Sequence, residues 1–300
     1  MATLYTNIES NIRKTWFYMT FFMILVIFVG WLLSYLLDSY FILYFAVIYS
    51  ILVSFISYWY SDKIVLSMNG ARLIEKKDNP ELYRLVENLC ITAGLPLVKI
   101  YIIDEAQPNA FATGRDPKHG VIAVTQGLLD NLDRVELEGV IAHELSHIGN
   151  RDALLQTVVV VLTGIVVTMV DFSFRIGLKR GFSSRNDNKA GWIIFLVSLI
   201  IAALAPLFAT LVKLAISRKR EFLADASGAL LTRYPEGLIR ALEKISNDPN
   251  NLRVVRNSTA HLYISSPFKG KQSQSWFARL FMTHPPIEER IKALRGMEIK

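Results

Sequence analysis

Four long stretches without a charged residue constrain the fold of this chain more than any other feature. They span residues 15–37, 39–61, 153–170 and 190–212. A helix needs about 20 apolar residues to cross the ~30 Å hydrocarbon layer of a bilayer. Three stretches reach that length and 153–170 is marginal, in a chain that is 52% hydrophobic with a mean hydropathy of +0.33. The sequence therefore predicts an integral membrane protein with up to four transmembrane helices.

The first two stretches form one unit, which we predict to be a transmembrane hairpin over residues 1–61. Its turn is expected at Asp38 and Ser39. The first stretch is too long and too rich in aromatic residues for a cleaved signal peptide, so we expect it to be retained. Basic residues stand at both ends of the hairpin. Because segments rich in Lys and Arg beside a membrane helix stay in the cytoplasm, we expect the chain after residue 61 to lie there.

The net charge of +7 and the isoelectric point near 9.4 require an explanation. The basic residues flank the apolar stretches, which is typical of contact with anionic lipid at a bilayer surface. No nucleic-acid-binding motif accompanies them, so we expect the lipid bilayer as a partner and no nucleic acid. The single cysteine, Cys90, rules out an intrachain disulfide and suits the reducing side of a membrane.

Residues 62–152 have the pattern of a folded domain outside the membrane. Asn79 and Pro80 begin a predicted helix with an apolar stripe, which ends before Gly94. We further expect strands at 98–104 and 121–124, a loop or irregular edge between them, and helices at 236–247 and 286–296. The predicted fold class is mainly α with a small β-sheet (α+β).

The next predicted helix carries a pattern of metal ligands. Asp133 and Glu136 form a capping-box signature at its start. The helix contains the sequence His-Glu-Leu-Ser-His, from His143 to His147. Because residues four apart share a helix face, both imidazoles can reach one tetrahedral ion, and Glu144 can take a proton from water. The alternative is two surface histidines on an amphipathic helix.

A catalytic zinc site requires a third protein ligand. Glu221 and Asp225 lie one helical turn apart, and a second carboxylate placed this way can orient a histidine ring. The alternative is a pair of solvated acids that balance the basic residues before them. The rival ligands are His119, His261 and His284.

Four motifs occur in order along the chain. They are Asn109–Gly114, His143–His147 followed by Asn150, Ser217–Asp225, and Thr283–Pro286. Together they resemble the HtpX family of heat-shock-linked bacterial membrane proteases, which is related to the CAAX prenyl endopeptidases. The resemblance covers essentially the whole chain. It departs from the family pattern at Arg151, where glycine is expected, and this change affects a helix end rather than a ligand.

The resemblance implies a gluzincin-like zinc protease domain with one zinc ion per subunit. His143, His147 and Glu221 are the implied ligands, and Glu144 is the implied catalytic base. Asp225 is implied to contact a ligand without binding the metal itself. The motif residues Asn109, Ala110, Phe111 and Ala112 are implied to be an edge segment beside the cleft. An edge strand can pair with an extended substrate backbone, whereas the alternative is a polar turn.

Three other residues have weaker assignments. His284 precedes two prolines and is interpreted as a residue at the start of a helix, not as a ligand. Arg218 or Arg220 could stabilise a developing oxyanion, but arginine that faces lipid or solvent is the favoured interpretation.

The ligands also limit how the chain crosses the membrane. Since Glu221 and the two histidines must lie on one side, the chain between them crosses an even number of times. We expect four parts: the hairpin 1–61, a first protease part 62–152, an apolar helix pair 153–212, and a second protease part 213–300. The loop 171–189 is basic, against the positive-inside trend if both helices span, so the depth of this pair stays open.

The sequence therefore predicts a multi-pass zinc endopeptidase of the bacterial inner (cytoplasmic) membrane with its catalytic domain in the cytoplasm. At ~1.5 Å per residue, both ligand segments lie roughly 10 Å from the membrane end of their helices. We accordingly expect membrane polypeptides as substrates. The resemblance implies quality control of damaged or misfolded membrane proteins under stress. The alternatives are a non-enzymatic membrane scaffold with a degenerate metal site, an intramembrane protease and a prenyl-protein processing protease.

Overall fold

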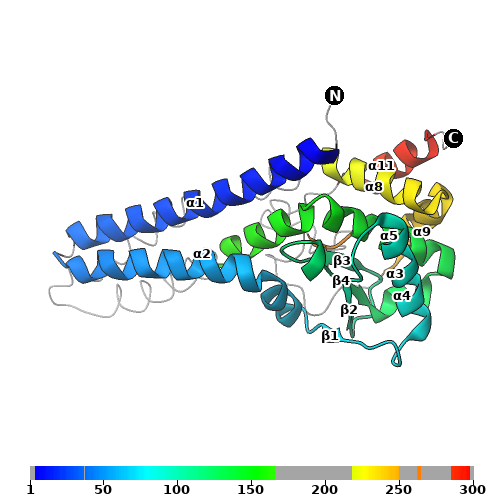
Figure 1. The fold of residues 1–300 in the computed structure, drawn as a ribbon, viewed down its shortest axis with the longest axis horizontal. Coiled ribbons are helices and arrows are strands. Elements are labelled where there is room, and N and C mark those ends of the chain that lie inside the picture. Colours follow the sequence, from blue (N-terminus) through cyan, green and yellow to red (C-terminus); the bar gives the residue numbers. More distant parts are fainter. Residues whose placement is uncertain (1–3, 37, 166–217, 250–261, 265–284, 298–300) are drawn as a thin grey trace.

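The computed structural model describes residues 4–36, 38–165, 218–249, 262–264 and 285–297, and shows a long helical hairpin attached to an α+β body (Figure 1). The hairpin consists of α1 (Leu4–Leu36) and α2 (Tyr40–Met68), which lie side by side. Both helices are long and apolar enough to cross a membrane. Their approach is close, since a Cβ added at Gly30 would lie 2.2 Å from the Cβ of Ala46. The predicted pair of membrane-capable helices, joined near Asp38 and Ser39, is therefore confirmed, and α2 continues to Met68, beyond the predicted end at residue 61.

The body contains one small mixed sheet. Its strands are β1 (Arg72–Leu73), β2 (Lys99–Ile103), β3 (Ala110–Thr113) and β4 (Val121–Thr125), in the spatial order β1-β2-β4-β3. β2 and β4 are parallel, and the other two pairs are antiparallel. Two strands agree with the sequence prediction, but the expected irregular segment between them contains β3. Its four residues are buried on both faces, so no alternation of polar and apolar residues marked it as a strand.

Helices surround this sheet, and local capping explains where two of them begin. In α3 (Pro80–Ala93), the side chain of Asn79 accepts a hydrogen bond from the Leu82 N–H, and the helix ends at Gly94 with φ of 64°. In α5 (Arg134–Gly149), Asp133 and Glu136 form the predicted capping box. The remaining described elements are η1 (Pro117–His119), α4 (Gln126–Asn131), α8 (Arg218–Thr232), α9 (Pro235–Asn247) and α11 (Ile287–Arg295).

The third apolar stretch begins as a helix over Asp152–Ile165, bent by 80° from α5. Arg151 lies at the bend with φ of 60°. This helix is buried from Asp152 to Thr163 and packs against Phe22 of α1 and Val53 of α2. It thereby joins the hairpin to the body (Figure 1). The fourth stretch, 190–212, and the loop 171–189 lie outside the described residues.

Candidate metal centre

The two histidines of the predicted motif lie on α5, most of whose residues are buried. α8 and α9 pack against it, and β3 and β4 lie on another side. His143 and His147 are 1% and 5% exposed, and Glu144 between them is 2% exposed. Surface histidines on an amphipathic helix would be exposed. The buried positions are therefore inconsistent with that alternative.

α8 brings Glu221 to the same place. The ε2 nitrogens of His143 and His147 lie 3.2 Å apart. Oε2 of Glu221 lies 3.9 Å from Nε2 of His143, and its Oε1 lies 3.7 Å from Nε2 of His147. Ligand atoms at tetrahedral angles around zinc, with bonds of ~2.0–2.2 Å, are separated by about 3.3–3.5 Å. These three residues therefore fit a single zinc-sized ion, with a fourth position left for water or substrate.

Small residues allow the two helices to approach this closely. A Cβ added at Gly228 of α8 would lie 2.9 Å from the backbone N of His143. Backbone atoms cannot yield as a flexible side chain does, so any larger residue at 228 would push α8 away from α5. Gly228 lies seven residues after Glu221, two turns along the same helix, and therefore helps to set the position of that carboxylate.

Asp225 and Arg290 lie on the Nδ1 side of the His143 ring. Oδ1 of Asp225 lies 2.9 Å from Nδ1 of His143. A carboxylate only accepts, so Nδ1–H donates and the lone pair of Nε2 points toward the other ligands. Arg290 of α11 in turn donates to both oxygens of Asp225, at 2.8 and 2.7 Å, and to the carbonyl of Ile264 at 2.9 Å. Arg290 is fully buried, and no motif in the sequence predicts its role.

His147 has a corresponding support from Asp152, whose Oδ2 lies 3.4 Å from Nδ1 of His147. The other oxygen of Asp152 accepts from Nδ2 of Asn11 at 2.7 Å and pairs with Nε of Arg220 at 3.2 Å. Nδ2 of Asn11 also donates to the carbonyl of Asn150, and its Oδ1 accepts from Arg220. The end of α1 is thus bonded to the residues that orient His147.

The interpretation of Arg220 as a lipid-facing or solvated residue is wrong. It is 9% exposed and engaged by Asp152 and Asn11, whereas Arg218 and Lys219 are exposed. The helical register explains the difference. Arg220 is adjacent to Glu221 on the buried side of α8, and a buried charge requires a partner.

The electrostatics of the centre favour a cation. Burial lowers the pKa of His143 to about 4, so its ring is neutral and able to coordinate a metal. Burial would also lower the pKa of His147, but Asp152, Glu221 and Glu144 raise it to about 9. For Asp225, burial acts to raise the pKa, and the neighbouring Arg290 and His143 lower it to about 2. The carboxylates that favour a proton on His147 favour a metal ion in the same way.

The predicted substrate segment is more enclosed than expected. β3 is the last strand in the sheet order, but Asn109, Ala110, Phe111 and Ala112 are all buried. The carbonyl of Ala110 accepts from the N–H of Ile264 at 2.9 Å, and the ring of Phe111 packs edge-on against Tyr263. Part of the strand edge is thus paired within the chain. Contact of this segment with a substrate stays a prediction.

The rival ligands do not join the cluster in the described part of the chain. His119 is exposed and pairs with Asp116 at 2.8 Å. His261 and His284 lie outside the described residues.

The centre belongs to a stretch of chain that matches a known family. The model of peptidase family M48 matches residues 76–298. The chain belongs to peptidase family M48. The match includes both histidines of α5, Glu221 and the supporting residues Asp152, Asp225 and Arg290, but not α1 and α2. As a member of this family with two membrane-capable helices, the chain is a membrane metalloprotease.

Relatives of this M48 chain extend the similarity over its whole length. A protease HtpX homolog of Dictyoglomus thermophilum is 49% identical over 298 residues, covering 98% of this chain and 95% of the relative. The HtpX homolog of Streptococcus gordonii is 41% identical over 98% of this chain and 100% of its own length. That of Pyrococcus furiosus is 45% identical over 89% and 91%. The resemblance to the HtpX family is therefore confirmed.

A solved structure shows the same fold at lower similarity. The crystal structure of S. mikatae Ste24p matches with a TM-score of 0.51 and 20% identity. The match covers 89% of this M48 chain, which spans 62% of the length of that protein. At this identity the comparison supports the predicted fold class of a mainly helical membrane protein with a small sheet.

Proposed function

We propose that this chain is a zinc-dependent endopeptidase that cuts membrane polypeptides close to the bilayer surface. One observation carries the proposal: three buried ligand atoms lie within 4.8 Å of one another on α5 and α8. Each imidazole among them is also backed by its own carboxylate. This arrangement is what a catalytic zinc site with one open position requires.

Zinc at this centre would supply Lewis-acid polarisation of the scissile carbonyl and activation of a water molecule. The residues of the chain have the other roles. Glu144, next to His143 on α5, takes a proton from the attacking water and returns it to the leaving amine. Asp225 and Asp152 hold the two imidazoles in the orientation that places Nε2 in the centre. Arg290 keeps Asp225 ionised and in position.

We further propose that the catalytic body lies in the cytoplasm of a bacterium, at the inner membrane. Arg13 and Lys14 stand near one end of the hairpin and Lys63 near the other, whereas its turn carries only Asp38. This asymmetry supports the cytoplasmic placement of both ends. Since Asn11, four residues before the first uncharged stretch, bonds to Asp152 beside His147, the centre would lie near the bilayer surface, which suits quality control of damaged or misfolded membrane proteins during stress.

The experiment that tests the proposal separates metal binding from catalysis. Glu144→Gln should keep zinc and lower peptide cleavage by about 10²- to 10⁴-fold, since a general base is lost. Glu221→Ala should lose both zinc and cleavage. Glu138→Gln, on the same helix outside the centre, is the matched control and should resemble the unmodified protein. Cleavage by Glu144→Gln at the normal rate would contradict the assignment of the base.

A further inference from the structure

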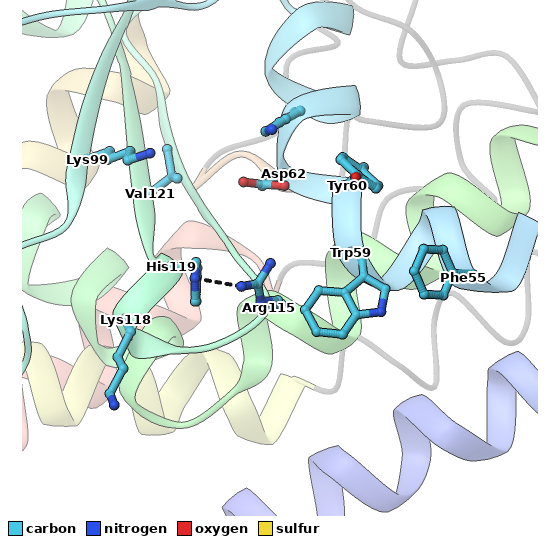
Figure 2. A pocket seen from close by; sticks show the side chains of 10 residues that line it. Phe55, Trp59, Tyr60, Asp62, Lys99, Arg115, Lys118, His119 and Val121 are labelled. Carbon is cyan, nitrogen blue, oxygen red and sulfur yellow. Dashed lines mark hydrogen bonds between the residues drawn. The ribbon is translucent and has the colours of Figure 1, made fainter.

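A second cluster of charged side chains lies near the C-terminal end of α2, and none of its residues belongs to the metal centre. It lines a hollow of about 520 Å³, shown in Figure 2. We call it the α2-end pocket, and its lining residues are Phe55, Trp59, Tyr60, Asp62, Lys63, Lys99, Arg115, Lys118, His119 and Val121. They come from α2, from β2 and β4, and from the segment between β3 and β4. None of them has a role in the proposed protease reaction.

The pocket has an excess of positive charge. Its lining contains four basic residues and one acidic residue, Asp62. Figure 2 shows Lys99 directed toward Asp62, and Arg115 between His119 and Trp59, whereas Lys118 points away from this group. Arg115 is held by His119 at 2.6 Å and by Asp116 at 3.5 Å. A guanidinium fixed in this way is well arranged to bind a phosphate oxygen.

Aromatic side chains form the opposite wall. The guanidinium of Arg115 lies 4.5 Å from the ring centroid of Trp59, and Nζ of Lys63 lies 5.2 Å from that of Tyr60. Phe55, Trp59 and Tyr60 are each between 43% and 55% exposed. The side of the sheet therefore contributes Lys99, Arg115 and Lys118, whereas α2 contributes three aromatic rings followed by Asp62 and Lys63.

The position of the pocket residues along α2 explains why the aromatic and charged side chains lie where they do. The helix has no charged residue from Tyr40 to Ser61, and Asp62 and Lys63 follow at once. Tryptophan and tyrosine gather at the boundary between hydrocarbon and headgroups. Trp59 and Tyr60 thus mark the headgroup level, with Phe55 about one turn deeper in the hydrocarbon. The cationic wall then faces the layer that contains lipid phosphates.

We propose that the α2-end pocket binds the headgroup of an anionic phospholipid. The phosphate lies against Arg115, Lys63 and Lys99, and the acyl chains pass Trp59 and Phe55 into the bilayer. A lipid headgroup and free phosphate have the same phosphate chemistry, so the cationic wall by itself fits either of them. The apolar wall, which is open at the level of the membrane, favours the lipid. The proposal depends on the hairpin spanning the membrane but not on proteolysis.

The test uses the full chain purified in detergent, with lipid binding followed by native mass spectrometry. The variant Lys63→Gln with Lys99→Gln removes two charges from the pocket. Lys76→Gln with Lys77→Gln removes two exposed charges elsewhere on the body and is the matched control. Phosphatidylglycerol and phosphatidylcholine with identical acyl chains are the lipid probes. Inorganic phosphate and glycerophosphoglycerol, a soluble headgroup, are tested as competitors.

The proposal expects the unmodified chain to prefer phosphatidylglycerol to phosphatidylcholine. The pocket variant should bind phosphatidylglycerol at least about fivefold more weakly, while the control variant binds it normally. Equal loss in both variants, or no preference between the two lipids, overturns the proposal. Displacement of the lipid by millimolar phosphate overturns the assignment to a lipid. Cleavage is not measured in this experiment, so its failure is distinct from failure of the proposed protease function. Thermal unfolding verifies that both variants fold.

Discussion

The metal centre and the α2-end pocket both gather charged residues, but they differ in burial. In the centre, Arg290, Asp225 and Glu221 are nearly inaccessible, and Arg290 and Asp225 share two short hydrogen bonds. In the pocket, Lys63 and Lys99 are exposed and the lining is unbalanced toward positive charge. Burial makes an unpaired charge costly, whereas water and salt screen an exposed one. The same kind of substitution should therefore have large effects in one region and small effects in the other.

The largest effect is expected from Arg290→Met, which leaves Asp225 buried without its ion-pair partner. Breaking a buried pair in this way costs about 3–5 kcal/mol. Arg295→Met, on the same helix, breaks an exposed pair with Glu243 and should cost less than about 1 kcal/mol. Thermal unfolding in detergent measures both. Similar losses for the two variants would remove the distinction between buried and exposed charge in this protein.

Asp152→Asn should come next, acting on metal affinity. The change keeps the shape of the side chain and removes the negative charge behind His147. Loss of such a supporting group lowers metal affinity by about 10- to 100-fold. Competition with a chelator measures zinc binding, and Asp130→Asn, an exposed change on α4, is the control. Unchanged zinc affinity in Asp152→Asn would show that this carboxylate does not support the ligand.

Asn11→Ala tests whether α1 belongs to the centre. It removes the bonds from α1 to Asp152, Asn150 and Arg220, but it leaves all charges in place. We expect a loss of roughly 1–3 kcal/mol in stability, because buried partners remain unsatisfied. A several-fold fall in zinc affinity should accompany it, since Asp152 is less firmly held. If stability falls while zinc affinity is unchanged, α1 anchors the body without positioning His147.

Arg151→Gly should have a small stabilising effect. Arg151 adopts φ of 60° at the bend after α5, a conformation that costs about 1 kcal/mol for a residue with a Cβ. Glycine relieves that strain, but the change removes a hydrogen bond to the carbonyl of Arg115 at 3.2 Å. The net gain in thermal unfolding should therefore stay below about 1 kcal/mol. Arg151→Ala, which loses the bond and keeps the strain, should be destabilised.

The smallest effect on stability is expected in the pocket. Lys63→Gln with Lys99→Gln should change the free energy of unfolding by no more than about 0.5 kcal/mol, since neither side chain is buried. Its effect should instead appear in lipid binding, and it should shrink as ionic strength rises. A loss of stability as large as that of Arg290→Met would mean that the pocket has a structural role.

Much of the fold followed from local patterns in the sequence. Uncharged stretches are sufficient to predict α1 and α2, because crossing a bilayer requires length and apolarity alone. Asn79 with Pro80, and Asp133 with Glu136, predicted the starts of α3 and α5, because capping depends on neighbours three residues apart. No local pattern marked β3 as a strand, because it is buried on both faces, and only the family resemblance indicated an edge segment at Asn109–Ala112. The spacing of His143 and His147 likewise placed them on one face of α5.

The tertiary structure decided which distant residues support those ligands. Nothing near Asn11 or Arg290 in the sequence distinguishes them from ordinary polar residues, whereas Asp152 lies only five positions after His147. Arg290 lies 147 positions from His143, and Asn11 lies 141 positions from Asp152. Their roles depend on burial, which no local pattern reports, and on helix contacts such as that of Gly228 with His143. The sequence by itself determined the membrane hairpin and the pair of histidines, because both depend on short-range spacing, whereas Glu221 was assigned only through the family resemblance. The folded chain alone determined how those ligands are held.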